Sequence, residues 1–436
     1  MFMPLNKTQQ KALNIMLSGQ NIFLSGKAGT GKSFVLQKFI EQCSEKKQII
    51  ICAPTGIAAL NINGSTIHKV FKAPIRPIIE KVSSNIKNDI LETADIIIID
   101  EISMCRCDLF SYVCQCIKIA EKRTKTKKQL IVVGDFFQLP PVVSDKDREI
   151  LEQGLTYNIK EGFAFSSPYW YNMHFHTIML NKIIRQSNQT FITHLNNIRN
   201  GNRISEAIDY INQNSAVKPN KNAITLCRTN TAAAIINNKN IEEINKPARI
   251  YYATTEGVFN NSDKPTDDIL ILKVGARVMA LINNEKNHYA NGSIGTVTRL
   301  TKDHVYVTFD DTLKNVKIPY NEWKNQKYTV VTDKNGNKKL DLKTIGSFKQ
   351  IPLKLAYAIT IHKSQGKTFE YATLSIDDSE KINNGQIYVA LSRVTSIGGL
   401  YLKQPLNPLS VKTSKTVQAF YKKKKEHIYH EKHEHH

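Results

Sequence analysis

Residues 26–33 read GKAGTGKS and combine glycines, two lysines and a final serine in a pattern suited to holding phosphate. Glycines let the chain curl so that several backbone N–H groups face one anion, and a helix that follows points its positive end at the same place. Lys32 is expected to reach the β- and γ-phosphates of a nucleotide, and Ser33 to coordinate Mg²⁺. The predicted phosphate-binding residues are Gly26, Ala28, Gly29, Thr30, Gly31, Lys32 and Ser33.

A pair of carboxylates follows the apolar run Ile96–Ile99. A carboxylate at the end of a strand can hold the hydration shell of Mg²⁺, and its neighbour can polarise an attacking water. We therefore assign Asp100 to Mg²⁺ and Glu101 to the general base of ATP hydrolysis. Taken alone, the pair would also fit a solvated acidic turn after a buried strand, but its combination with residues 26–33 favours catalysis.

A third polar group follows the apolar run at residues 129–133, in the string GDFFQLPP at residues 134–141. A glutamine at the tip of a strand next to the phosphate loop can hydrogen-bond the γ-phosphate and report its loss, which is the role we expect for Gln138. Kinases, GTPases, AAA-type unfoldases and recombination ATPases also have phosphate loops, so the rest of the chain must decide the class of enzyme.

The elements that must position these residues alternate between short apolar runs and helical patterns. Buried strands are predicted at residues 21–25, 48–53, 96–99 and 129–133, with helices between most of them. This alternation predicts a parallel sheet with right-handed crossovers. The pattern resumes in the second half, with strands near residues 223–227, 373–376 and 400–402, and therefore predicts a second α/β domain.

Residues 289–345 have a different sequence pattern from the α/β regions on either side. Short alternating strands are predicted at residues 296–300, 305–309 and 316–319, and Asn-Gly turn signals occur at residues 291–292 and 335–336. This region is expected to form a small antiparallel barrel or sheet that is inserted into the second α/β domain.

Length and charge are consistent with a multidomain protein that binds polyanions. The 436 residues favour two or three domains, and the formal net charge of +22 would concentrate nucleic acid around the protein. Asn, Ile and Lys are abundant throughout, so compositional bias is an alternative source of the charge. No apolar run is long enough to cross a membrane and no secretory signal is recognised, which predicts a cytoplasmic (nucleoid) or nuclear protein that is not secreted.

The seven cysteines and the histidines of the tail raise the question of metal binding. The odd number of cysteines favours reduced thiols. Cys105, Cys107, Cys114 and Cys116 could suggest zinc, but residues 109–120 have a helical pattern, and residues two apart on a helix point to different sides. Helix packing is therefore favoured over a metal or redox role. The tail at residues 411–436 is basic and His-rich; we expect it to be mobile, with loose metal binding as the alternative.

The string at residues 134–141 resembles motif III of superfamily 1 helicases, and other strings resemble the remaining motifs of that superfamily in the same order. They are residues 5–9 for the Q motif, 53–59 and 64–68 for motifs Ia and Ib, 183–186 for motif IV, 358–366 for motif V and 388–394 for motif VI. Residues 101–104 (EISM), followed by the predicted helix, resemble the signature of the petite integration frequency (PIF) family, whose members are 5′→3′ DNA helicases.

The resemblance implies an α/β fold of two RecA-like parallel-sheet domains with a small SH3-like β-barrel insertion. It places RecA-like domain 1A at residues 1–175 with a short 1B wedge at 71–92, domain 2A at 176–288 and 346–410, the SH3-like domain 2B at 289–345, and the tail at 411–436.

The resemblance also implies roles for further residues. Gln9 is expected to contact the adenine of ATP, and Arg185 and Arg393 to act as arginine fingers from the second domain. Residues placed by their motifs to contact DNA are Thr55, His68, Thr360, His362 and Ser364, and Phe71 could stack on a base or pack in the core. The implied partners are single-stranded DNA and forked or 5′-tailed duplexes, with no membrane, and we expect a monomer.

These observations predict an ATP-dependent 5′→3′ DNA helicase that travels on single-stranded DNA and unwinds duplexes, with G-quadruplexes as a further substrate, in replication, repair or recombination. ATP and Mg²⁺ are the expected cofactors. Alternatives are an ATP-gated protein that binds single-stranded nucleic acid without unwinding, a RecD-like subunit of a recombination helicase, and a motor that acts on RNA.

Overall fold

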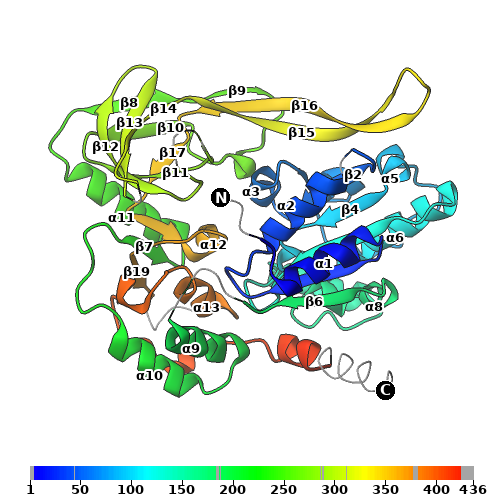
Figure 1. Ribbon diagram of the computed structural model, residues 1–436, viewed down its shortest axis with the longest axis horizontal. Coiled ribbons are helices and arrows are strands. Elements are labelled where there is room, and N and C mark those ends of the chain that lie inside the picture. Colours follow the sequence, from blue (N-terminus) through cyan, green and yellow to red (C-terminus); the bar gives the residue numbers. More distant parts are fainter. Residues whose placement is uncertain are drawn as a thin grey trace. The chain divides into compact units, whose positions relative to one another are not determined.

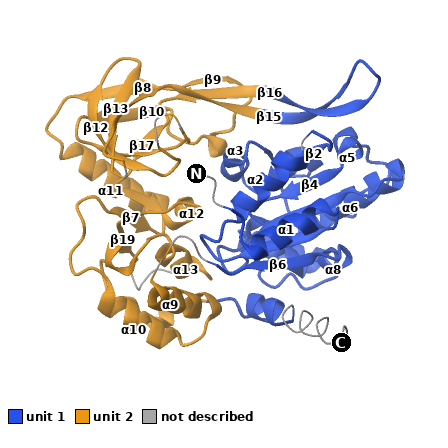
Figure 2. Cartoon of the chain, in the orientation of Figure 1, with its two compact units in different colours: residues 1–184, 326–344, 413–436 blue, residues 185–325, 345–412 orange. Residues whose placement is uncertain are grey.

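The computed structural model describes residues 4–43, 45–182, 186, 188–284, 286, 289–310, 312–376 and 382–423. The chain divides into two compact units, coloured separately in Figure 2. Unit 1 comprises residues 1–184, 326–344 and 413–436, and unit 2 comprises residues 185–325 and 345–412. The backbone therefore passes from one unit to the other after residues 184, 325, 344 and 412.

Unit 1 is built on a six-stranded sheet in the order β3-β2-β4-β5-β1-β6, and every pairing in it is parallel. The strands are β1 (Ile22–Gly26), β2 (Ile49–Ala53), β3 (Ser65–Thr66), β4 (Ile96–Ile99), β5 (Gln129–Gly134) and β6 (His176–Leu180). The apolar runs of the first half form β1, β2, β4 and β5, which confirms the predicted parallel α/β fold.

Both faces of this sheet are covered by helices (Figure 1), because neighbouring residues of a strand point to opposite sides. Phe23, Ile97, Ile99, Leu130 and Val132 pack on the side of α6 and α8, and Ile22, Leu24, Ile96, Ile98, Ile131 and Val133 pack on the side of α1 and α2. The helices of unit 1 are α1 (Lys7–Leu17), α2 (Lys32–Cys43), α3 (Gly56–Asn61), α4 (Ile67–Phe71), α5 (Asp89–Thr93), α6 (Cys107–Thr124), α7 (Asp145–Gly154) and α8 (Pro168–Asn172).

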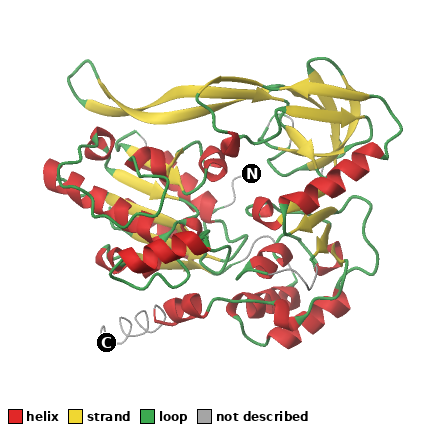
Figure 3. Cartoon of the chain, turned by 180° about the vertical axis from the view of Figure 1, so that it is seen from behind, coloured by secondary structure: helices red, strands yellow, loops and turns green. Residues whose placement is uncertain are grey.

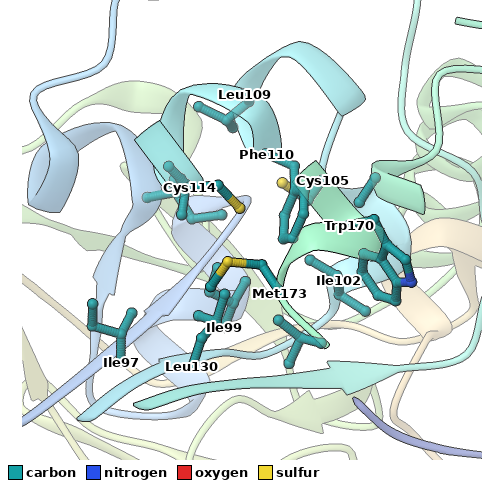
Figure 4. Packing of buried hydrophobic residues seen from close by; sticks show 14 of the residues in the cluster. Ile97, Ile99, Ile102, Cys105, Leu109, Phe110, Cys114, Leu130, Trp170 and Met173 are labelled. Atoms are coloured by element: carbon teal, nitrogen blue, oxygen red, sulfur yellow. The ribbon is translucent and has the colours of Figure 1, made fainter. Parts of the chain in front are cut away.

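The cysteine-rich helix α6 packs its apolar face into this core. Figure 4 shows Cys105 and Cys114 among Phe110, Trp170 and Met173. All seven cysteines are buried as free thiols, and burial raises the pKa of Cys107 and of Cys116 to about 12. A buried protonated thiol behaves as a small apolar side chain, so the structure has the helix packing that the sequence favours.

The irregular segment between α4 and α5 is anchored to the start of α6 by a buried carboxylate. Asp108 accepts hydrogen bonds from the backbone N–H of Ile78 at 2.8 Å and from Arg106 Nε at 2.6 Å. The Asp108 side chain is 0% exposed, whereas Asp147, a second partner of Arg106 at 3.2 Å, is 30% exposed. Asp108 also accepts from Arg106 Nη2 at 2.9 Å, so the two carboxylates on one guanidinium differ both in burial and in the hydrogen bonds that they accept.

Unit 2 contains a four-stranded parallel sheet in the order β18-β7-β19-β20. Its strands are β7 (Ile224–Cys227), β18 (Ala358–Thr360), β19 (Ala372–Ser375) and β20 (Leu400–Leu402), and the helices of unit 2 are α9 (Gln189–Asn200), α10 (Ile204–Asn214), α11 (Asn230–Glu242), α12 (Ile361–Ser364) and α13 (Gln386–Leu391). The second parallel sheet expected from the sequence is therefore present.

Unit 2 also contains antiparallel sheets, of which the largest has the order β14-β13-β12-β11-β17. The antiparallel strands are β8 (Ala248–Tyr252), β9 (Thr254–Gly257), β10 (Ile269–Lys273), β11 (Arg277–Ala280), β12 (Ile294–Leu300), β13 (His304–Phe309), β14 (Asn315–Pro319), β15 (Asn321–Thr332), β16 (Lys338–Gln350) and β17 (Leu353–Leu355). The sheet extends beyond residues 289–345 because β11 and β17 pair with each other, and its SH3-like character stays a prediction.

Strands β15 and β16 form a long ribbon (Figures 1 and 3) whose outer part belongs to unit 1. The backbone N–H of Ile51 donates to the Tyr328 hydroxyl at 2.9 Å, and the backbone N–H of Leu340 donates to Gln48 Oε1 at 2.8 Å. Tyr328 is buried with the core of unit 1. The ribbon is thus shared between the two compact units, although the sequence places it in one insertion.

The tail is only partly what the sequence predicts. Residues 415–423 are helical and pack on unit 1, so the expectation of a mobile segment from residue 411 onward is wrong for this part. Val417, Phe420 and Tyr421 are buried because their spacing places them on one face of the helix. Residues 424–436, which carry the histidines, lie outside the described residues. Among the residues that are described, no helix is long and apolar enough to cross a membrane.

We expect Asp108→Ala to lower the free energy of unfolding by about 3 kcal/mol, because it leaves the buried N–H of Ile78 without its acceptor and the half-buried Arg106 guanidinium with only the partly exposed Asp147 as a charged partner. Asp147→Ala is the matched control and should cost at most about 1 kcal/mol, since its carboxylate is partly solvated. Urea unfolding of both variants measures the difference. Equal losses would contradict the assignment of Asp108 as the anchor.

Candidate active site

Three loops leave the same edge of the unit 1 sheet. Strands β4, β5 and β1 are adjacent and parallel, so the chain after Ile99, Gly134 and Gly26 emerges at their carboxyl ends. Ligands of open α/β sheets bind outside this edge. The topology therefore brings together the three groups of polar residues that the sequence singles out.

The phosphate loop connects β1 to α2 and depends on its glycines. Gly29 and Gly31 have φ values of 74° and 82°, in the left-handed region that glycine adopts most readily. A Cβ at Gly26 would lie 2.7 Å from Thr30 Oγ1 and 2.8 Å from the carbonyl oxygen of Leu180. The Thr30 hydroxyl donates to the carbonyl of Lys27 at 2.9 Å and closes the loop.

Lys32 is half-buried at the start of α2 and points back into this loop. Its Nζ donates to the carbonyl oxygens of Gly26 at 2.9 Å and of Lys27 at 3.2 Å. The ammonium group is thus held at the centre of the loop, where a phosphate could replace the carbonyl oxygens as its acceptor. Ser33 follows on the first turn of α2 and is exposed.

Gln9 is tied to the phosphate loop from α1. Its Oε1 accepts from the backbone N–H of Asn6 at 3.0 Å, which completes a capping box, and its Nε2 donates to the carbonyl oxygen of Thr30 at 3.1 Å. The side chain is buried. The structure therefore places Gln9 against the backbone of the loop, and an adenine contact stays a prediction.

Asp100 and Glu101 lie at the end of β4. Asp100 accepts from the backbone N–H of Glu101 at 2.8 Å, and Glu101 has a left-handed φ of 50°, which is uncommon outside glycine. Burial raises the pKa of Asp100, opposed by the Glu101 N–H and by the Lys32 ammonium. A carboxylate and a serine hydroxyl are oxygen ligands of the kind that Mg²⁺ prefers, and the cation would favour the ionised form of Asp100.

Gln138 is held in a tight turn after β5. Its backbone N–H donates to the carbonyl oxygen of Asp135 at 3.0 Å, and the Asp135 carboxylate accepts from the N–H of Phe137 at 3.2 Å. Asp135 and Gln138 are both buried. Because β5 pairs with β1, this turn begins beside the phosphate loop, as the sequence predicts for a γ-phosphate contact.

The arginines predicted from motifs IV and VI belong to unit 2. Arg393 is 1% exposed, and its guanidinium donates to the carbonyl oxygen of Val389 at 2.8 Å and to Ser392 Oγ at 2.7 Å. Gln186 donates to the carbonyl oxygens of Ser392 and Val394, which fixes the loop that carries Arg393. Arg185 lies outside the described residues.

The DNA-contacting residues predicted in unit 1 differ in accessibility. Thr55 and Thr66 cap the helices α3 and α4 through their hydroxyl groups, and His68 is half-buried. Burial and the nearby Arg106 lower the pKa of His68. Phe71 is 0% exposed within the core of unit 1, so of the two roles considered for it the structure shows core packing.

The predicted contacts of unit 2 gather on α12. Thr360 caps the helix by accepting from the backbone N–H of Lys363 at 3.3 Å, and Ser364 is buried and donates to the carbonyl oxygen of Ile361 at 2.7 Å. His362 is exposed on this short helix. The two hydroxyl groups therefore shape the segment, whereas His362 is open to solvent.

Sequence reasoning missed two lysines beside α12. Burial lowers the pKa of Lys354 to about 7, with further lowering by Lys367 and Lys363 and opposition from Asp267. Burial also lowers the pKa of Lys367 to about 8, and its Nζ donates to Asn291 Oδ1 at 2.5 Å. Lys354 could have been recognised from the sequence, because it is the one charged residue in the otherwise apolar run IPLKLAYAI at residues 351–359.

Comparison with known proteins places these features in one family. A family model described as PIF1-like helicase matches residues 4–209. The ATP-dependent DNA helicase Pif1 of Campylobacter jejuni is 30% identical over 415 residues, which cover 88% of this chain and 89% of that protein.

Solved structures agree. The Pif1 of a Bacteroides species in complex with ADP-AlF4 has a TM-score of 0.87 and 32% identity, with 98% of each chain covered. Bacteroides Pif1 bound to single-stranded DNA has a TM-score of 0.69 and 33% identity, again with 98% of each chain covered.

Glu101→Gln should retain nucleotide binding and lower ATP turnover by about 10² or more, because the amide cannot accept a proton from water. Lys32→Ala is the companion variant and should lose nucleotide binding as well as turnover, while binding of single-stranded DNA persists. Binding of a fluorescent ATP analogue and release of phosphate separate the two. Wild-type turnover in Glu101→Gln would rule out Glu101 as the base.

Proposed function

This chain belongs to the PIF1-like helicase family, and we propose that it uses ATP hydrolysis to move 5′→3′ along single-stranded DNA and to unwind the duplex ahead. It is an ATP-hydrolysing DNA helicase. The observation that carries the proposal is the convergence of Lys32, Asp100 with Glu101, and Gln138 at one edge of a parallel sheet, in a chain with a second parallel-sheet unit.

The proposed chemistry assigns one role to each residue. Lys32 exchanges its contacts with the loop carbonyls for the β- and γ-phosphates, and Glu101 accepts the proton of the attacking water. Ser33 and Asp100 would hold Mg²⁺, which neutralises phosphate charge when it is bound. Gln138 hydrogen-bonds the γ-phosphate and loses that partner after hydrolysis.

We assign Arg393 and Arg185 as the groups of unit 2 that stabilise charge on the transferring phosphoryl group. An arginine in this role is worth roughly 10³–10⁵ in rate in other NTPases. Because Arg393 is anchored to the backbone at Val389, it moves with unit 2 as a rigid part. The contact of Arg393 with phosphate would therefore require the two units to close, and loss of this contact after hydrolysis would let them open.

DNA is proposed to run across both units. Thr55 and His68 in unit 1, and in unit 2 Thr360, which caps α12, together with His362 and Ser364 of α12, provide contacts to the backbone of the strand. Such contacts carry no sequence information, which suits a motor that must pass over any sequence. We add Lys354 and Lys367 to this surface, because two ammonium groups beside α12 would attract phosphate.

An ATP-gated clamp that binds single-stranded DNA without unwinding is the alternative that the active site alone would also allow. The proposed motor and the clamp share ATP turnover, so only an assay of strand separation distinguishes them. We also propose that the protein acts in DNA replication, repair or recombination, at the nucleoid or in the nucleus.

The lysine pair makes DNA binding depend on pH. At pH 6.5, below the pKa values of about 7 and about 8, Lys354 and Lys367 are mainly cationic, and at pH 8.5 they are mainly neutral. Affinity for single-stranded DNA should therefore fall with rising pH, by about three- to tenfold at constant ionic strength. The double variant Lys354→Met, Lys367→Met should lose this dependence, whereas Lys302→Met, which changes an exposed lysine of unit 2, should keep it. The same pH dependence in all three proteins would exclude the pair from the DNA path.

Polarity is tested with duplexes that carry a 5′ DNA tail, a 3′ DNA tail or a 5′ RNA tail. We expect unwinding of the 5′-tailed DNA duplex, with little or none on the 3′ tail and less on RNA. The reason is the family relationship, since closure of two units does not by itself set a direction. Preference for the 3′ tail at equal enzyme concentration would overturn the proposed direction but not the ATPase.

A further inference from the structure

The segment at residues 413–423 belongs to unit 1, and its residues 415–423 are helical. The chain enters it directly from unit 2 at Lys412. Ser414 starts the helix by accepting from the backbone N–H of Val417 at 3.0 Å and donates to Glu161 Oε1 at 2.5 Å. Val417 is 0% exposed. These contacts fix the segment on unit 1 before its aromatic residues begin.

Two adjacent aromatic rings then enter the core in different ways. Phe420 stacks on Phe165 with 4.3 Å between ring centroids and an interplanar angle of 16°. Tyr421 stacks on Phe137 at 5.0 Å and 11°, directly next to Gln138 in the chain. Phe420 also meets the Phe136 ring edge-on at 5.5 Å, so both rings pack against the loop that carries the proposed γ-phosphate sensor, and what distinguishes Tyr421 is its hydroxyl group.

The Tyr421 hydroxyl lies where two strands of the active site separate. Ser25 of β1 pairs with Gly134 of β5, and beyond this pair β1 continues into the phosphate loop and β5 into the Gln138 turn. The hydroxyl is 2.8 Å from Ser25 Oγ and accepts from the backbone N–H of Phe136 at 3.4 Å. One side-chain atom thus bridges the starts of both loops.

Packing alone does not require this hydroxyl. A phenylalanine would fill the same space, and a buried phenol is tolerated only when it finds hydrogen-bond partners. Here the partners are Ser25, which precedes the phosphate loop, and Phe136, which lies in the turn that ends at Gln138. We propose that Tyr421 is a positioning residue, whose hydroxyl sets the spacing between the phosphate loop and the Gln138 loop during ATP hydrolysis.

This inference rests on the proposed role of Gln138 and has a conservative test. Tyr421→Phe keeps the ring stack and removes the hydroxyl, so the DNA-stimulated kcat should fall about tenfold while the KM for ATP changes less than twofold. Amide hydrogen exchange of the peptide that contains Phe136 should become at least fivefold faster. In a Ser25→Ala background, Tyr421→Phe should lower kcat less than it does in the wild type, because the two side chains share one hydrogen bond.

Phe420→Leu is the matched control, because it alters the neighbouring ring and leaves the hydroxyl in place. It should lower the melting temperature more than Tyr421→Phe does, yet keep kcat within twofold of wild type. If kcat follows the melting temperature in both variants, or if Tyr421→Phe has wild-type kcat, the role is structural and the proposal is wrong.

Gln138→Ala, assayed in parallel, separates this inference from the proposed function. If Gln138→Ala loses turnover and Tyr421→Phe does not, the inference on Tyr421 alone fails. If Gln138→Ala keeps wild-type turnover, the sensor role fails and the inference fails with it, although ATP hydrolysis by the wild-type protein still supports the active site.

Discussion

The active site depends on the parallel pairing of β4, β5 and β1. Parallel strands end at one edge, so the residues that follow Ile99, Gly134 and Gly26 must share a small volume although they are far apart in the chain. The buried apolar residues on both faces of the sheet fix this register. The Lys32 ammonium lies near enough to the Asp100 carboxylate to lower its pKa because of the sheet, and the loops supply only the local geometry.

The elements that could be predicted from the sequence are those with local causes. The run Ile96–Ile99 is a strand because β-branched residues suit a buried sheet, and residues 26–33 form a phosphate loop because Gly29 and Gly31 permit left-handed backbone. The polar groups after each strand were recognisable because catalytic side chains commonly follow a buried strand in such sheets. Each of these signals lies within about ten residues.

The features that could not be predicted depend on contacts between distant segments. Asp108 and Ile78 are 30 residues apart in the sequence, and Tyr328 and Ile51 are 277 residues apart, so no local sequence pattern predicts either hydrogen bond. The packing of residues 415–423 is hard to predict because charged residues dominate the tail and obscure the helical spacing of Val417, Phe420 and Tyr421. The sequence cannot decide between base stacking and core packing for Phe71, because an aromatic residue three positions after His68 fits both roles.

The central claim is that turnover at this edge drives movement along DNA rather than a single closing event. The most direct test is the number of ATP molecules hydrolysed in one binding event on single-stranded DNA of increasing length, with a trap that prevents rebinding. A motor consumes ATP in proportion to the length of the strand, and this proportionality is the result that we predict. A number that does not change with length would show a clamp that opens and closes in place, and would contradict the account.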